Sequence, residues 1–219
     1  MPDRPALRAI VFDFDGVILE SAEVKTRAFV ELFSSHGTDV QRRVREHHLA
    51  NLGISRFKKF AWIYEHILAM PLSDEDSKAL GDRFTALALE NVLAAPFVPG
   101  AHEALVALAP HHALFVASGT PQAELDLIVE RRSLHGLFRE VHGTPRDKPT
   151  ILTDLMDRHG LTPEHVLFIG DGLSDYQAAI TTSIAFLARD TPELHEQWLG
   201  LGVQRHADLR GLVDFVRKW

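Results

Sequence analysis

Short apolar runs that end in polar residues recur along the chain, and they predict buried parallel strands. The first covers residues 9–12 and is followed by Asp13-Phe14-Asp15-Gly16. Three later runs, at residues 113–117, 165–169 and 184–188, also stop at polar residues. A nearly continuous apolar run is typical of a strand that is covered on both faces. Each run is therefore expected to leave its carboxyl end at an exposed edge of one sheet.

Amphipathic stretches lie between these runs and predict helices. Residues 101–108, 122–131 and 150–159 have the helical spacing of apolar residues, and each stretch follows a proline within two residues, as helix starts often do. Strands that alternate with helices predict βαβ units. We therefore expect an α/β fold with a Rossmann-like, doubly wound and mostly parallel sheet that carries helices on both faces.

Residues from about 20 to 95 break this alternation, because they contain helical periodicity but no convincing strand. The predicted buried faces are Ala28, Phe29, Leu32 and Phe33, then Phe57, Phe60, Ile63, Tyr64 and Ile67, then Leu80, Phe84, Leu87 and Val92. This pattern indicates a four-helix module inserted after the first strand. We expect a helical domain over residues 19–96 and a core domain formed by residues 1–18 and 97–219.

The composition excludes several classes of function. The chain has 219 residues, 46% of them hydrophobic, a formal net charge of −7 and no cysteine. An acidic chain is a poor match for nucleic acid or an anionic membrane as its main partner. Disulfides and thiolate metal sites are excluded. With no signal peptide and no apolar run long enough to span a bilayer, a cytoplasmic location is the expectation. The sequence predicts no oligomeric state.

Acidic and hydroxyl side chains gather where the predicted strands end. Asp13 and Asp15 follow the first strand, Ser118 follows the second, and Asp171 and Asp175 follow the third. In a doubly wound sheet, ligands bind in the crevice beyond these carboxyl ends. Converging carboxylates repel one another unless a cation lies among them, and oxygen ligands without cysteine favour Mg²⁺.

Lys148, at a predicted helix start, completes a site for a phosphate group. Asp13 and Asp15 are two residues apart in an extended segment, so both carboxylates can reach one substrate. One can attack phosphorus to give an aspartyl-phosphate, while the other protonates the leaving oxygen and then activates water. A single acid at a strand end is more often a helix cap, but capping does not explain the whole set.

Four ordered segments of the chain resemble the motifs of the haloacid dehalogenase (HAD) superfamily. They are Asp13-Phe14-Asp15-Gly16-Val17, Ala117-Ser118-Gly119-Thr120, Lys148-Pro149, and Gly170-Asp171-Gly172-Leu173-Ser174-Asp175. The helical insert resembles the cap of the first structural subclass of this superfamily. The resemblance implies that Asp13 is the nucleophile and Asp15 the general acid and base.

The same resemblance implies the binding residues. Ser118, with Gly119, and Lys148 would bind the transferring phosphoryl group. Mg²⁺ would be held by the Asp13 carboxylate, the main-chain carbonyl of Asp15 and Asp171, with Asp175 supporting it directly or through water.

Three cationic residues of the insert are candidates for substrate contacts. The segment 51–56, Asn-Leu-Gly-Ile-Ser-Arg, resembles the substrate loop of β-phosphoglucomutase-like members, whose arginine binds a substrate phosphate. Arg56 is therefore the best candidate, and its guanidinium suits a phosphate or carboxylate. Lys59 lies one helical turn further and either assists or faces solvent. Lys25 occupies a position where the mutases carry a histidine, which makes the mutase activity a weaker match.

These features predict a Mg²⁺-dependent phosphatase of a small phosphorylated metabolite, a sugar phosphate or a phosphorylated acid. The alternative is a β-phosphoglucomutase-like phosphosugar mutase that uses the same residues. A 2-haloacid dehalogenase ranks low because it normally lacks an acid at the position of Asp15, and phosphonate cleavage is disfavoured for the same reason. A non-catalytic phospholigand-binding protein would have no chemical need for both Asp13 and Asp15. The adjacent pairs His47-His48 and His111-His112 are interpreted as surface or interface residues.

Overall fold

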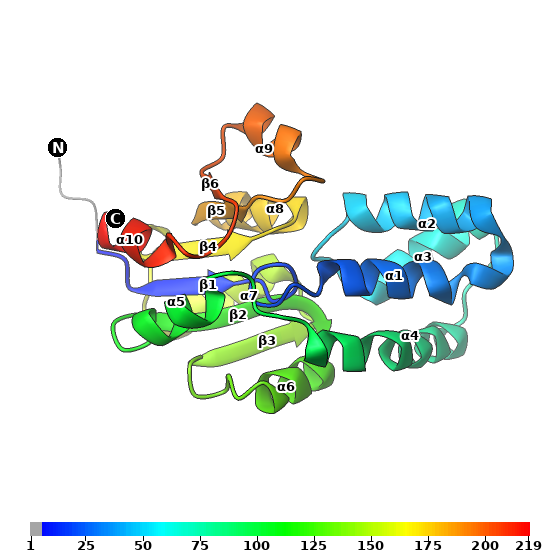
Figure 1. Cartoon of the computed structure of the whole chain (residues 1–219), viewed down its shortest axis with the longest axis horizontal. Helices are drawn as coiled ribbons and strands as arrows, with labels where there is room; N and C mark the ends of the chain where they lie inside the picture. The colour runs from blue at the N-terminus through cyan, green and yellow to red at the C-terminus, as the bar shows by residue number, and fades with distance from the viewer. Residues whose placement is uncertain (1–5) are drawn as a thin grey trace.

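Six parallel strands form one sheet within residues 6–219, the part of the chain that the computed structural model describes (Figure 1). They are β1 Ala9–Phe12, β2 Ala113–Pro121, β3 Glu140–Thr144, β4 Val166–Gly170, β5 Ala185–Arg189 and β6 Arg205–His206. Their order is β3-β2-β1-β4-β5-β6, and all neighbours are parallel. This confirms the predicted doubly wound sheet. The strand order reverses beside β1, which places a ligand crevice at the carboxyl ends of β1 and β4.

Helices cover both faces of the sheet. They are α5 Ala101–Leu108, α6 Gln122–Arg131, α7 Lys148–His159, α8 Leu173–Thr182, α9 His195–Leu201, α10 Leu212–Arg217 and the short 3-10 turn η3 Pro163–His165. Alternate residues of β1 point to opposite faces. Ile10 and Phe12 pack in a cluster with α5, α6 and α10, whereas Ala9 and Val11 pack with α7 and α8. Every residue of β1 is buried, as its unbroken apolar run predicts.

The described chain between β1 and α5 forms four α-helices and two short helical turns. They are α1 Ala22–Leu32, η1 Ser34–His36, α2 Thr38–Ala50, α3 Arg56–Ile63, the π-helical turn η2 Tyr64–Leu68, and α4 Asp74–Ala94. In Figure 1 they lie together at one end of the molecule, beyond the carboxyl end of β1. Phe29 is the centre of their packing, because its ring lies 5.6 Å from that of Phe60 and 4.7 Å from that of Phe84. We call α1–α4 with their connections the cap; its bounds as a separate domain remain a prediction.

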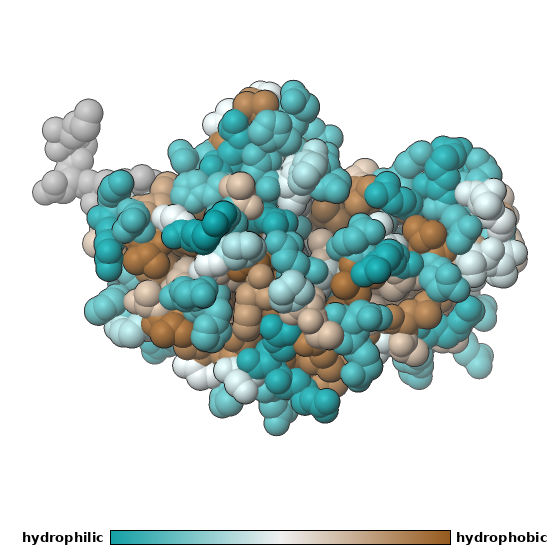
Figure 2. All heavy atoms as spheres, viewed as in Figure 1, coloured by the Kyte–Doolittle hydropathy of each residue, from teal (hydrophilic) through white to brown (hydrophobic). Residues whose placement is uncertain are grey.

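Some sequence expectations differ from the structure. Phe57 and Leu87 were placed on buried helix faces, but each is 38% exposed. The second strand extends beyond its apolar run as far as Pro121, so that Ser118 and Gly119 lie within β2 and not after it. None of the helices in the described residues is long and apolar enough to cross a membrane. Figure 2 shows hydrophilic residues over most of the visible face, with hydrophobic residues in small separate patches.

Candidate active site

The loop after β1 brings the first two acids to the carboxyl end of the sheet. The main-chain N–H of Asp13 donates to the carbonyl of Ile169 in β4 at 2.8 Å, so the loop leaves the sheet beside that strand. Gly16 follows with a φ of 78°, and a Cβ there would lie 2.0 Å from Oδ2 of Asp171. Only glycine therefore allows the loop after β1 to approach the loop after β4.

Lys148, the first residue of α7, lies between two buried carboxylates. Its Nζ is 2.9 Å from Oδ2 of Asp13 and also forms an ion pair with Asp175. Asp175 is in the first turn of α8, where its Oδ2 accepts a hydrogen bond from the N–H of Gly172 at 3.0 Å. Burial raises the pKa of Asp13 to about 7, although Lys148 acts in the opposite direction. Burial disfavours the charged form of Lys148, but Asp13 and Asp175 outweigh it and raise the pKa of this lysine.

Three carboxylates form a cluster that fits a hard cation. Asp13, Asp171 and Asp175 are buried, and each offers an oxygen atom within 4.8 Å of the others. Burial, together with the charges of Asp13 and Asp175, raises the pKa of Asp171 well above its usual value. Within residues 6–219, no ion pair joins Asp171 to a cationic side chain. Lys148 alone therefore balances three acids, and an all-oxygen donor set of this charge suits Mg²⁺ or a similar ion.

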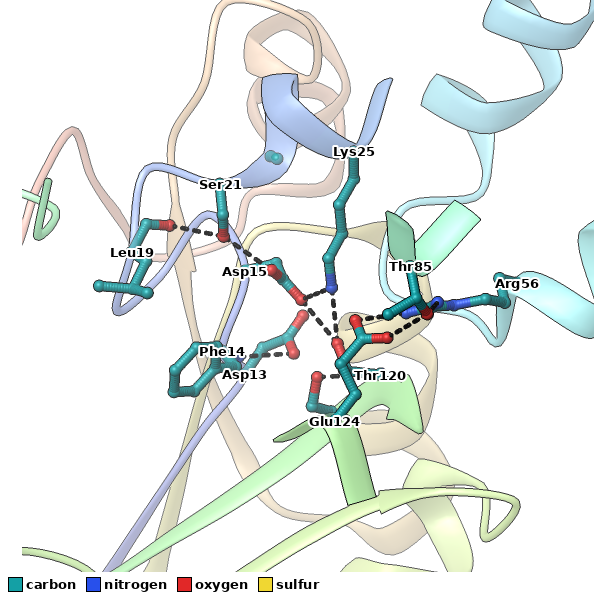
Figure 3. Close-up of polar contacts among 12 residues, drawn as sticks. Asp13, Phe14, Asp15, Leu19, Ser21, Lys25, Arg56, Thr85, Thr120 and Glu124 are labelled. Atoms are coloured by element: carbon teal, nitrogen blue, oxygen red, sulfur yellow. Dashed lines mark hydrogen bonds and ion pairs between the residues drawn. The ribbon is translucent and has the colours of Figure 1, made fainter. Parts of the chain in front are cut away.

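The side chain of Asp15 has its own set of partners (Figure 3). The Ser21 hydroxyl donates to Oδ1 at 2.6 Å and the Thr120 hydroxyl donates to Oδ2 at 2.9 Å. Lys25 of α1 forms an ion pair with Oδ2 and donates to the Thr120 hydroxyl at 2.6 Å. Burial alone would raise the pKa of Asp15, but Lys25 and the two hydroxyls outweigh it, so the pKa is lowered. Asp15 is thus a carboxylate beside the three-carboxylate cluster.

A loop of the cap lies directly over the strand ends. Gly53, with a φ of 81°, is so close to the core that a Cβ on it would lie 2.5 Å from Oγ of Ser174 and 2.8 Å from Nζ of Lys148. The Ser174 hydroxyl donates to the carbonyl of Leu52 at 2.7 Å. A Cβ on Gly119 would lie 2.5 Å from the carbonyl oxygen of Gly53. The cap is therefore closed on the core, and glycines on both sides permit the contact.

Two cavities meet at this contact. The first has a volume of about 50 Å³, and the residues that line it include Asp13, Asp15, Lys25, His48, Arg56, Lys59 and Asp171. The second, of about 270 Å³, is lined by Ser118, Lys148 and Arg146, among others. Gly53, Ile54 and Gly119 line both cavities. Ser118 is buried, and its Oγ accepts a hydrogen bond from the N–H of Thr120 at 3.2 Å. The structure thus brings all the sequence-predicted site residues to this region.

Arg56, the sequence candidate for a substrate contact, already has a counter-ion. Its guanidinium lies 2.6 Å from Oε1 of Glu124 in α6 and donates to the Thr85 hydroxyl at 2.9 Å (Figure 3). It also lies over the ring of Phe84, 4.4 Å from the centroid. The side chains of Arg56 and Glu124 are only 5% and 7% exposed. This ion pair joins α3 of the cap to α6 of the core.

Lys59 and His48 are the residues whose environment differs most from the sequence interpretation. Lys59 is 3% exposed, and its Nζ lies 3.0 Å from Nδ1 of His48. His48 is also buried, so placing it at the surface or an interface was wrong. Lys59 lies one helical turn after Arg56, and this spacing was the feature of the sequence that indicated it as a site residue. No sequence pattern pointed to His48 or Glu124 as site residues, and Thr120 was included only as the last residue of the motif at 117–120, with no role of its own.

Comparisons with known proteins agree with this geometry. The chain is 27% identical to a phosphoglycolate phosphatase of Synechococcus elongatus, with 79% of each chain covered. Its structure is similar to that of CbbY from Rhodobacter sphaeroides in complex with phosphate, with a TM-score of 0.75 and 18% identity over 94% of this chain and 96% of that chain. A HAD-superfamily hydrolase of subfamily IA, variant 1, from Geobacter sulfurreducens gives a TM-score of 0.63 and 18% identity over 98% and 99% of the two chains.

At 18% sequence identity, similarity between two structures shows only that they share a fold. The assignment to a family rests on a match to a family model. The family model described as haloacid dehalogenase-like hydrolase matches residues 7–181. This range contains β1 to β4, the cap and all of the acids described above. The chain therefore belongs to the haloacid dehalogenase-like hydrolase family.

Proposed function

We propose that the protein is a Mg²⁺-dependent phosphatase that hydrolyses a small phosphorylated metabolite, a sugar phosphate or a phosphorylated acid. The observation that carries the proposal is the buried group of Asp13, Lys148, Asp171 and Asp175 beside the first cavity. The phosphatase relative from Synechococcus elongatus supports the reaction class. We propose a class of substrate and no individual compound.

The two acids after β1 divide the proposed reaction between them. An oxygen of Asp13 attacks phosphorus, the ester P–O bond breaks, and Asp15 donates a proton to the leaving oxygen. In the second step water attacks phosphorus, Asp15 accepts a proton from it, and the bond to Asp13 breaks to release phosphate. In the free protein Asp15 is a carboxylate, which is the form that the second step needs. The first step needs the protonated form of Asp15, and the Lys25 ammonium, which donates to Oδ2, can supply that proton and take it back from Asp15 after the second step.

Binding of the phosphoryl group is proposed for Lys148, Ser118 and Gly119. Nζ of Lys148 is 2.9 Å from Asp13, so a group held by Asp13 would be within its reach. The metal ion would be held by the Asp13, Asp171 and Asp175 carboxylates and the Asp15 carbonyl. When bound it would offset the charge of the acids and of the phosphoryl oxygens.

The closed cap gives the reaction a water-poor chamber. The first cavity, of about 50 Å³, has room for only a few water molecules or a compact organic group. Its walls come from both the cap and the core, so opening the cap would admit substrate and water. We propose that residues 19–96 act as this cap domain and that residues 1–18 and 97–219 form the core domain.

The test is phosphate release from a panel of phosphorylated metabolites, measured with Mg²⁺ and with a chelator. Wild-type protein should release phosphate only with the metal. The Asp13→Asn variant should remain folded by circular dichroism and lose at least about a hundredfold in rate, because an amide cannot form the aspartyl-phosphate. If Asp13→Asn retains more activity than that, or if no ester is hydrolysed, the proposal is wrong.

The same assay separates the phosphatase from the phosphosugar mutase. With a sugar bisphosphate present, a mutase would convert a sugar monophosphate into its isomer, whereas a phosphatase would release inorganic phosphate. The ion pair between Lys25 and Asp15 favours the phosphatase, since the mutases carry a histidine at the position of Lys25.

A further inference from the structure

The cap places three cationic side chains around the first cavity, and one of them has no counter-ion among the residues that the structure describes. Lys25 pairs with Asp15, and Arg56 pairs with Glu124. Lys59 lines the same cavity, but within residues 6–219 it forms no ion pair with a carboxylate. Its exposed neighbour Lys58 lies in water, whereas Lys59 is 3% exposed. A buried ammonium without a counter-ion is costly, so its pKa falls unless an anionic group balances the charge.

Hydrogen bonding leaves Lys59 with unused donors. An ammonium has three N–H donors. His48 Nδ1, 3.0 Å away, accepts one of them, and the ring of Phe29 lies 5.3 Å from Nζ. Burial and the charge of Lys59 lower the pKa of His48 well below its usual value, so the imidazole is neutral and acts as an acceptor. Two donors of Lys59 therefore remain for a molecule in the cavity.

Lys59 lines the same cavity as Asp13, Asp15 and Asp171, so their charges act on it. Burial, with a smaller effect of the charges of Lys25 and Lys148, lowers the pKa of Lys59 to about 7. The charges of Asp171 and Asp15 raise it. An anionic group bound at Lys59 would have the same effect as these acids and would stabilise the ammonium form. Arg56 offers no such unbalanced charge, since Glu124 neutralises it.

We propose that Lys59, oriented by His48, binds a carboxylate of the substrate, so that the enzyme acts on small phosphorylated carboxylic acids in preference to neutral phosphorylated alcohols. This inference rests on the proposed function. One unbalanced cation with two free donors matches a carboxylate, which has a single charge and two oxygens. A second phosphate would bring nearly twice that charge. Asp13, Asp15 and Lys59 line the same small cavity, so a short spacer between the two anionic groups is enough for a substrate to reach both ends.

The test compares two phosphate esters of similar size that differ in this charge. They are 2-phosphoglycolate, which carries a carboxylate, and 2-hydroxyethyl phosphate, which carries a neutral hydroxymethyl group in its place. Wild-type protein should have a kcat/KM about ten- to a hundredfold higher for 2-phosphoglycolate, as expected for a charge-assisted hydrogen bond. Lys59→Met, which keeps the length of the side chain, should lower kcat/KM by about that factor for 2-phosphoglycolate and by less than about threefold for 2-hydroxyethyl phosphate.

The matched control is Lys78→Met, since Lys78 is an exposed lysine of cap helix α4. It should change neither rate. Equal losses on both esters in Lys59→Met, or no loss on either, would overturn the inference. Wild-type protein provides a measurement that does not depend on the folding of a variant: a kcat/KM that is equal for the two esters, or higher for 2-hydroxyethyl phosphate, also overturns it.

A third compound separates this failure from failure of the proposed function. p-Nitrophenyl phosphate has no carboxylate, so its hydrolysis does not depend on the proposed contact with Lys59. If wild-type protein hydrolyses it without preferring 2-phosphoglycolate to 2-hydroxyethyl phosphate, only the Lys59 inference is wrong. If wild-type protein with Mg²⁺ hydrolyses none of the three and no other ester of the panel, the proposed function is wrong and the inference falls with it. If it hydrolyses other esters of the panel but not 2-phosphoglycolate, only the inference is wrong.

Discussion

The ion pair between Arg56 and Glu124 should be a main contributor to cap closure. Both side chains are nearly fully buried, and the N–O distance is 2.6 Å. Thr85 completes a closed triangle, because its hydroxyl accepts from Arg56 and donates to Glu124 at 2.8 Å. Removing one partner of a buried ion pair typically costs about 3–5 kcal/mol, because the other charge is left without a partner.

Glu124→Gln keeps an acceptor for the guanidinium but removes the charge, so the lower end of this range applies. A cost of about 3 kcal/mol corresponds to a fall in Tm of about 6–12 °C for a chain of this size. The pair joins α3 to α6, so part of the cost can appear as opening of the cap without global unfolding. Hydrogen exchange and limited proteolysis near residues 16–21 and 94–99 should therefore report faster opening in the variant.

A double-mutant cycle with Arg56→Met, Glu124→Gln and the combined variant isolates the pair itself. Each single variant leaves a buried polar or charged group unsatisfied, so the combined variant should be more stable than the sum of the two losses predicts. The control is Arg42→Met, because Arg42 pairs with Asp39 and Glu46 on the surface of α2, and Tm should hardly change. Strictly additive losses in the cycle would refute a direct contribution of the pair.

Two further variants test the carboxylate cluster and an ion-pair group at the edge strand β3. Asp171→Ala should lower Mg²⁺ affinity and activity together, and a Mg²⁺ titration that matches wild type in both would exclude Asp171 as a ligand. Burial would raise the pKa of Glu140, but hydrogen bonds from His159, His142 and Arg158 outweigh it and lower this pKa to about 2. The stabilisation by Glu140 is therefore complete above its usual value of 4.5 and is lost as pH falls from there towards 2. Tm should fall more steeply over this range in wild type than in Glu140→Gln, and parallel curves would contradict the assignment.

Elements with a strong local pattern were predictable from the sequence. The helices over residues 101–108 and 122–131 have the predicted bounds, because apolar spacing and a preceding proline specify them locally. Strands β1 and β4 were predictable because helices cover both faces of each strand, so that each is an unbroken apolar run in the sequence. The edge strands β3 and β6 were missed: Glu140–Thr144 is only half buried and largely polar, and Arg205–His206 has two residues. Pairing with a neighbouring strand creates such elements, and a single chain segment does not encode that pairing.

The core of the site was predictable for a related reason. Each acid directly follows an apolar run, so topology alone brings Asp13 and Asp171 to the same edge of the sheet. No comparable rule of topology predicts the contacts between the cap and the core. Arg56 and Glu124 are 68 positions apart, and their pairing depends on where α3 lies on the core. The sequence therefore indicated a guanidinium that was free to bind substrate, whereas the folded chain has already neutralised it.

The cap charges then serve two separate purposes. Lys25 and Arg56 pair with Asp15 and Glu124 outside the cap helices, so both contacts favour closure in the absence of any ligand. Lys59 is buried among cap residues, where its Nζ contacts His48 and the ring of Phe29, and within residues 6–219 no carboxylate forms an ion pair with it. A ligand shifts a conformational equilibrium only by as much as it binds one state better than the other. On the proposed assignment, a substrate carboxylate in the cavity between cap and core supplies a counter-charge for Lys59, so that a ligand held by both parts favours the closed state through the side chain that selects it.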